Sequence, residues 1–326
     1  MKLHLVAPDT SAGPPPPNAT GPYRAFAEAA AESRAGHGLT DDPADAELIV
    51  VCTSNTTHGV HMTRFLDSSM YRRWRERCVA LSVADRVIPV LPGGYTSTVD
   101  ERHIAGWSFP VHYIDANLHQ FDFGGRDWPE RDIPFAFVGA TATDLVRQRM
   151  MDAVLPEGSV RIDVWPKGGR PWWTGTTEEI ADRRNTFKDT MERTRYALCP
   201  RGRSANSIRL YEAMEAGCVP VLLADQAVLP EGPDWDSFVV RVREAEVDRV
   251  ARIASRYDFE ADVRGRRARR AWEEWFAPGR YFDRIVEGLA AVARPESPRF
   301  RDAMRTTWHL RARAHAAIRA VRGRPA

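Results

Sequence analysis

Short continuous apolar runs alternate with amphipathic segments in the first part of the chain. The runs at 3–7, 46–52 and 77–85 have the length of strands and are mostly apolar, a pattern typical of parallel strands covered on both faces. Residues 22–35 are rich in alanine, begin at a proline and end before a glycine, as helices do. This order of strand and helix predicts a Rossmann-like unit over residues 1–130.

The same rhythm restarts in the second half. An apolar run at 134–139 ends at a glycine, and a second run follows at 160–165. A predicted helix over 204–216 stops before a glycine, and the run at 219–224 then has the character of a buried strand. We expect a second Rossmann-like domain over residues 131–290.

Composition and charge agree with an ordinary globular enzyme-sized protein. The 326 residues are 43% apolar and 28% charged, and this length favours two domains with a cleft between them. The formal net charge of +2 gives no electrostatic reason to expect binding to nucleic acid. No window approaches the ~20 apolar residues of a membrane-spanning helix, and the first nine residues do not resemble a signal peptide. We therefore expect a cytoplasmic location.

Cysteine and histidine spacing gives little support for a metal. The four cysteines form no C-x-x-C pair, and most of them sit in apolar runs, so we expect reduced, buried thiols. They are Cys52, Cys78, Cys199 and Cys218. His58 and His61 are three residues apart but have no third ligand in register. We predict no metal site and no cofactor.

The end of the chain is basic. From Arg294 onward there are nine arginines against two acidic residues, and Trp308 and Leu310 give a modest apolar face. We interpret residues 291–326 as a basic helical tail that is solvated. Weak contact with an anionic membrane surface or attraction to a charged acceptor is the alternative.

The segment 196–213 carries the clearest chemistry. It predicts a strand that runs into a tight loop and then into a helix, whose start presents N–H groups and a partial positive charge to an anion. Gly202 would let the backbone approach a diphosphate, and Arg201 and Arg203 can donate charge-assisted hydrogen bonds to its oxygens. Ser207 can bond to a phosphate or cap its own helix.

Arg209 and Glu212 lie three residues apart and share one face of the predicted helix. A carboxylate in this position can accept hydrogen bonds from both ribose hydroxyls of a nucleotide, while the guanidinium neutralises phosphate. The competing interpretation is a plain surface ion pair beside a solvated turn over 201–203.

The same residues resemble a known family. In residue type and order, the C-terminal region of exostosin-family glycosyltransferases is similar to Cys199-Pro200-Arg201-Gly202-Arg203, Ser207-Ile208-Arg209, Glu212-Ala213, Gly217-Cys218-Val219-Pro220-Val221, Leu229-Pro230 and Trp235. A weaker similarity covers Phe135-Ala136-Phe137-Val138-Gly139 with Arg147, which resemble the start of the donor domain in that family. Residues 1–130 resemble the family only in general layout.

The resemblance implies an α/β fold of GT-B type, in which two Rossmann-like domains face each other across a cleft. It further implies an inverting transfer of a sugar from a nucleotide-sugar donor, usually a UDP-sugar, to a hydroxyl of a glycan, lipid-linked or small-molecule acceptor. The chain is short, and we expect neither the membrane anchor of animal and plant relatives nor a second catalytic module. The predicted donor-binding residues are Gly139, Arg147, Arg201, Gly202, Ser207, Arg209 and Glu212.

Inverting transfer needs a base for the acceptor hydroxyl and stabilisation of the departing diphosphate. The arginines and the helix start can supply the second, so no metal is demanded. Asp85 is our first candidate for the base because it closes an apparent buried strand, although a turn-capping aspartate fits the same pattern. The alternatives are Asp9 and the group His112, Asp115 and His119.

Aromatic residues suggest one more contact. Trp172 and Trp173, between Pro171 and Gly175, can stack on a sugar or a nucleobase, or pack under a loop. Two other functions share the diphosphate pocket: a nucleotide-sugar epimerase or phosphorylase, and a non-catalytic protein that binds a nucleotide or a glycan.

Overall fold

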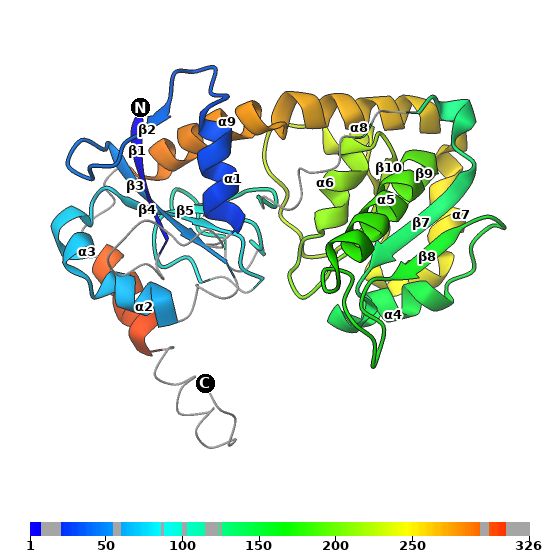
Figure 1. Cartoon of the computed structure of the whole chain (residues 1–326), viewed down its shortest axis with the longest axis horizontal. Coiled ribbons are helices and arrows are strands. Elements are labelled where there is room, and N and C mark those ends of the chain that lie inside the picture. Colours follow the sequence, from blue (N-terminus) through cyan, green and yellow to red (C-terminus); the bar gives the residue numbers. More distant parts are fainter. Residues whose placement is uncertain are drawn as a thin grey trace. The chain divides into compact units, whose positions relative to one another are not determined.

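A computed structural model describes residues 1–7, 21–54, 60–85, 88–99, 103–114, 123, 126–293 and 300–310. Two compact units are present: the first comprises residues 1–116 and 278–326, and the second residues 117–277. Each unit has one sheet with helices packed on it (Figure 1). Four candidates from the sequence lie outside the described residues: Asp9, His58, Asp115 and His119.

The first unit is built on a parallel six-stranded sheet in the order β2-β1-β3-β4-β5-β6. Its strands are β1 (Lys2–Val6), β2 (Gly38–Leu39), β3 (Leu48–Thr53), β4 (Cys78–Ser82), β5 (Gly93–Tyr95) and β6 (Ser108–Pro110). Its helices are α1 (Gly21–Ala30), α2 (Val60–Leu66), α3 (Ser69–Trp74) and α9 (Pro278–Val292).

Both faces of this sheet are covered, which explains the continuous apolar runs. In β3, Leu48 and Val50 pack in a cluster with residues of α1 and α9, whereas Ile49 and Val51 pack in a second cluster with residues of α2 and α3. Adjacent strand residues point to opposite faces, so a strand that is buried on both sides has no polar alternation.

The second unit has a parallel five-stranded sheet in the order β11-β10-β9-β7-β8. Its strands are β7 (Ile133–Gly139), β8 (Val160–Asp163), β9 (Thr194–Pro200), β10 (Val219–Leu223) and β11 (Val240–Arg241). Its α-helices are α4 (Leu145–Asp152), α5 (Thr177–Arg193), α6 (Ile208–Glu215), α7 (Val250–Ala254) and α8 (Ala261–Trp275). Short 3₁₀ helices occupy Trp128–Glu130, Thr141–Thr143, Trp235–Ser237, Glu244–Arg249 and Ser255–Glu260.

The carboxyl ends of the central strands of this second sheet meet at one edge. Gly139 lies opposite Asp163, and Leu223 lies opposite Pro200. Ligands of open α/β sheets bind outside this edge, so the register places the loop after β9 where a ligand is expected. The two sheets confirm the predicted α/β class with two Rossmann-like domains, the organisation of GT-B proteins.

The division of the chain differs from the predicted boundaries of 1–130, 131–290 and 291–326. Residues from Pro278 onward belong to the first unit because α9 packs on α1. The Phe282 ring lies 4.7 Å from that of Phe26, and the Tyr281 hydroxyl donates to the Ala25 carbonyl at 2.9 Å. The partner of an amphipathic helix is not encoded in its own sequence, so this return of the chain was not predicted.

The described part of the basic tail is also packed. Residues 300–310 form a helix in which Trp308 is buried and donates to Thr63 Oγ1 at 3.0 Å. Arg301 is buried too and donates to the carbonyls of Arg75 and Cys78. These residues therefore do not form the solvated helix that the sequence suggested. No helix of the described ranges is both long and apolar enough to cross a bilayer.

Candidate donor-binding site

The predicted strand, loop and helix are present between β9 and α6. The strand ends at Pro200, and α6 begins at Ile208, later than predicted, because residues 204–207 stay non-helical and buried. Ser207 occupies the N-cap position, but its side chain does not cap the helix. Within the described part of the chain its Oγ is buried without a hydrogen-bond partner. A buried hydroxyl without a partner is uncommon in proteins, and a hydrogen bond to a bound ligand is one explanation for it.

The loop is not the solvated turn that formed the alternative interpretation. Gly202 is buried, Arg201 is half-buried, and only Arg203 of these three residues is exposed. The structure therefore favours a partly buried loop that can face a ligand over a solvated turn, although Arg203 is exposed.

Arg201 lies between two carboxylates that the sequence did not predict. Its Nη1 is 2.8 Å from Asp144 Oδ2, and its Nε donates to both carboxylate oxygens of Glu244 at 3.0 Å. Glu244 in turn accepts a hydrogen bond from the backbone N–H of Asp225. The charge of Arg201 is thus already compensated, and a phosphate at this position has to compete with these carboxylates.

Arg147 of α4 holds the loop after β9 through hydrogen bonds to backbone carbonyls. It is buried, and its guanidinium donates to three carbonyls: Arg201 at 2.9 Å, Pro200 at 3.2 Å and Ala140 at 3.3 Å. The planar fork of arginine suits this arrangement because it donates several bonds in fixed directions. Arg147 therefore fastens the carboxyl ends of β7 and β9 together.

Gly139 and Gly202 leave space for this guanidinium. A Cβ on Gly202 would lie 3.1 Å from Nη2 of Arg147, and a Cβ on Gly139 would lie 3.3 Å from Nη1 and 2.9 Å from the Phe137 ring. The two glycines were predicted from phosphate approach and strand pattern. In the structure their missing side chains also make room for a buried arginine.

Arg209 and Glu212 form an ion pair on the predicted shared face of α6. Their side chains are only 16% and 5% exposed, so the interpretation as a plain surface ion pair is wrong. Arg209 also donates to the Val138 carbonyl and lies over the Phe187 ring, 4.5 Å from its centroid. Burial lowers the pKa of the Arg209 guanidinium, and the nearby charge of Arg147 lowers it further. A desolvated cation interacts strongly with a neighbouring charge, and here that charge is the carboxylate of Glu212.

The tryptophans predicted from the sequence separate into two roles. Trp172 is half-buried, whereas Trp173 is exposed and pairs with Trp165. The pairing was missed because Trp165 belongs to the end of a strand-like run.

At the carboxyl edge of the first sheet, Asp85 follows β4 and is half-buried. His112 is buried, with its ring 4.8 Å from that of Tyr281. Thr53, the last residue of β3, and Ser97, two residues after β5, have buried hydroxyls without hydrogen-bond partners among the described residues. The assignment of the base to Asp85 stays a prediction. The described ranges contain no group of three or more His, Cys, Asp or Glu residues arranged to hold a metal.

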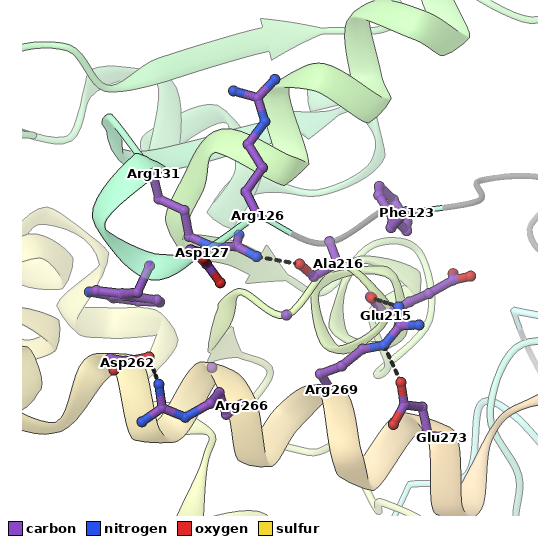
Figure 2. Close-up of a pocket in the computed structure, with 13 residues that line it drawn as sticks. Phe123, Arg126, Asp127, Arg131, Glu215, Ala216, Asp262, Arg266, Arg269 and Glu273 are labelled. Carbon is purple, nitrogen blue, oxygen red and sulfur yellow. Dashed lines mark hydrogen bonds and ion pairs between the residues drawn. The ribbon is translucent and has the colours of Figure 1, made fainter.

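A separate cavity of about 310 Å³ lies in the second unit, near the amino ends of β7 and β10 (Figure 2). None of the predicted donor-binding residues lines it. Its arginines are engaged by acids or carbonyls: Arg126 with Asp189, Arg131 with the Ala216 carbonyl, Arg266 with Asp262, and Arg269 with Glu273. This cavity is therefore not an anion site comparable to the loop after β9.

Comparison with known proteins agrees with this geometry. The family model of the exostosin GT47 domain matches residues 119–257, which lie within the second unit. A probable glucuronosyltransferase of Oryza sativa subsp. japonica is 31% identical over 151 residues, covering 41% of this chain and 35% of that protein. A probable β-1,4-xylosyltransferase of Arabidopsis thaliana is 34% identical over 119 residues, covering 33% and 29%. The matches thus span about a third of the length of these relatives.

The second unit is an α/β domain that contains the whole region matched by the exostosin GT47 model. Residues 119–257 are thus similar to the exostosin GT47 domain of glycosyltransferases, as the sequence resemblance indicated.

Proposed function

We propose that this protein is an inverting glycosyltransferase that moves a sugar from a nucleotide-sugar donor, of the UDP-sugar type, to a hydroxyl of a glycan, lipid-linked or small-molecule acceptor. The predicted donor-binding residues all lie inside the matched exostosin domain. The relatives are named as glucuronosyl- and xylosyltransferases, which supports sugar transfer. The buried Arg209–Glu212 pair at the start of α6 carries the proposal.

In the proposed complex, Glu212 accepts hydrogen bonds from the ribose hydroxyls and Arg209 faces the diphosphate. Both residues are already desolvated and paired, so the nucleotide has to give each of them hydrogen bonds that offset any loss of the ion pair. The unpartnered Ser207 hydroxyl and the N–H groups at the start of α6 add donors for phosphate oxygens.

These groups stabilise the negative charge that develops on the leaving diphosphate. Arg147 acts indirectly, because it donates hydrogen bonds to carbonyls of the loop and does not contact the ligand. For the acceptor hydroxyl we propose Asp85 as the base that removes the proton.

UDP titration by calorimetry tests the donor site. We expect Glu212→Gln to weaken UDP binding about tenfold to a hundredfold, since one to two hydrogen bonds to a charged group are worth about 1.5–3 kcal/mol. Glu178→Gln, an exposed acid of α5, is the matched control and should bind UDP as the wild type does. Unchanged affinity in a folded Glu212→Gln protein would refute the ribose assignment.

Product analysis tests the reaction. Mass spectrometry of donor and acceptor mixtures distinguishes a transferred sugar from an epimerised or phosphorolysed donor. If UDP binds but no donor is consumed with any acceptor, the protein is a nucleotide-binding protein and not a transferase. Full turnover by Asp85→Asn would exclude Asp85 as the base.

A further inference from the structure

The segment between β8 and α5 comprises residues 164–176, and we name it the tryptophan loop (Figure 1). It carries a pair of exposed indoles, Trp165 and Trp173. Trp165 is 37% and Trp173 57% exposed. Their ring centroids are 5.5 Å apart with an interplanar angle of 80°. Single exposed apolar side chains are common, but two adjacent indoles that remain exposed are typical of a recognition surface.

The loop that carries the indoles is held in place. The Trp172 backbone N–H donates to the Val164 carbonyl at 2.9 Å. Arg183 of α5 donates to the carbonyls of Trp172 at 3.1 Å and Thr174 at 2.7 Å. These contacts order the backbone before any ligand arrives, which lowers the entropy lost on binding.

The tryptophan loop is also cationic. Lys167 and Arg170 are exposed, and neither forms an ion pair with any residue in the described parts of the chain. The loop contains no acidic residue between Val164 and Thr177. Two uncompensated cations beside two indoles form a surface that is complementary to an anion with an apolar face.

A short chain of contacts connects this surface to the donor-binding loop. The Asp163 carboxylate accepts hydrogen bonds from the Trp165 N–H at 2.9 Å and from the Thr141 hydroxyl at 2.5 Å. Thr141 begins the turn that leads to Asp144, which pairs with Arg201. Both loops follow strands of the same sheet, and β7 alone separates β8 from β9. The tryptophan loop thus lies at the ligand-binding edge.

We propose that the tryptophan loop binds an anionic glycan, with a pyranose ring stacked on Trp173 and Trp165 and its carboxylate paired with Lys167 and Arg170. A pyranose has one face of C–H groups that packs on an indole, and a uronate adds the charge that the two cations complement. The near-perpendicular indoles form an open corner and cannot hold a planar nucleobase between two parallel faces. The role of this glycan as the acceptor rests on the proposed function, but its binding does not.

Calorimetric titration of the full chain tests the proposal with three acidic hexasaccharides, made of galacturonate, mannuronate, or alternating glucuronate and N-acetylglucosamine. Each is paired with its carboxyl-reduced form. We expect the wild type to bind at least one acidic form more tightly than its reduced form. Trp173→Ala should weaken both forms about tenfold or more. Phe259→Ala, which removes another exposed aromatic of the second unit, is the control and should change neither.

The double variant Lys167→Ser/Arg170→Ser isolates the charge. Its affinity for the acidic form should fall about twofold to tenfold, while its affinity for the reduced form stays unchanged. The variant should therefore bind the two forms equally. Wild-type failure to bind any of the six oligosaccharides overturns the proposal, as does unchanged affinity in Trp173→Ala. Binding of phosphatidylglycerol vesicles in place of glycans would assign the surface to a membrane and overturns it equally.

UDP titration of the same variants separates this inference from the proposed function. We expect Trp173→Ala to bind UDP as the wild type does, because the indole is assigned to the glycan. A tenfold loss of UDP affinity would assign the indole to the nucleobase and refute the glycan contact. If the wild type does not bind UDP, the donor site fails on its own, and the oligosaccharide titrations still decide the role of the tryptophan loop.

Discussion

Replacing Arg147 with methionine removes the guanidinium that fastens the ends of β7 and β9. The three carbonyls of Ala140, Pro200 and Arg201 lose a charged donor, and the methionine side chain still fills most of the volume. A hydrogen bond to a charged group contributes about 1.5–3 kcal/mol, and bonds made by one side chain are not additive. We expect a loss of about 3–5 kcal/mol in the free energy of unfolding of the second unit, together with weaker UDP binding.

Arg147→Lys distinguishes support of the loop from direct contact with phosphate. Lysine keeps the charge but lacks the fork, so it cannot donate to three carbonyls at once. If Arg147 supports the loop, the lysine variant loses stability and UDP affinity much as the methionine variant does. If Arg147 bound phosphate directly, lysine would preserve most of the affinity and would leave the stability unchanged.

Urea unfolding and UDP calorimetry measure the two quantities separately. Gln148→Met in the same helix is the matched control. Its side chain is exposed, so the substitution should change the free energy of unfolding by at most about 0.5 kcal/mol. An Arg147→Met protein with wild-type unfolding free energy would refute the supporting role.

Three further outcomes follow from packing and burial. Burial raises the pKa of Asp283, but hydrogen bonds from a serine hydroxyl and two backbone N–H groups together lower it by more, so that it lies below its ordinary value. Asp283→Asn should therefore lower the free energy of unfolding by about 1–3 kcal/mol at pH 7. This difference in urea stability should shrink as the pH falls through the folded pKa, and a constant difference would contradict the assignment. Burial raises the pKa of the Cys52 and Cys78 thiols to about 12. At pH 8 a thiol reagent should therefore react with them only as the protein unfolds, and immediate reaction of the native protein would disprove this. Gly93→Ala places a Cβ 2.0 Å from a carbonyl oxygen of the neighbouring strand and should lower the melting temperature strongly. Gly38→Ala should not lower it, because no atom lies within 4 Å of the added Cβ. Equal melting temperatures of the two variants would refute the steric argument.

Much of the local structure was readable from the sequence. The apolar runs at 46–52 and 134–139 became β3 and β7 because a strand that is covered on both faces must be apolar throughout. The facing of Arg209 and Glu212 was equally predictable, since residues three apart on a helix are neighbours. These features depend only on residues close together in the chain.

Contacts between distant segments were decided by the tertiary structure. The sequence around Arg201 does not predict that Asp144 and Glu244 are its partners, because these residues come from the segments that follow β7 and β11. The buried state of the Arg209–Glu212 pair likewise depends on Phe187 of α5. The sequence by itself determined the α/β character of both halves and the strand, loop and helix of the candidate donor site. The order of the strands decided which charges are compensated there, because that order brings together residues that no local pattern relates.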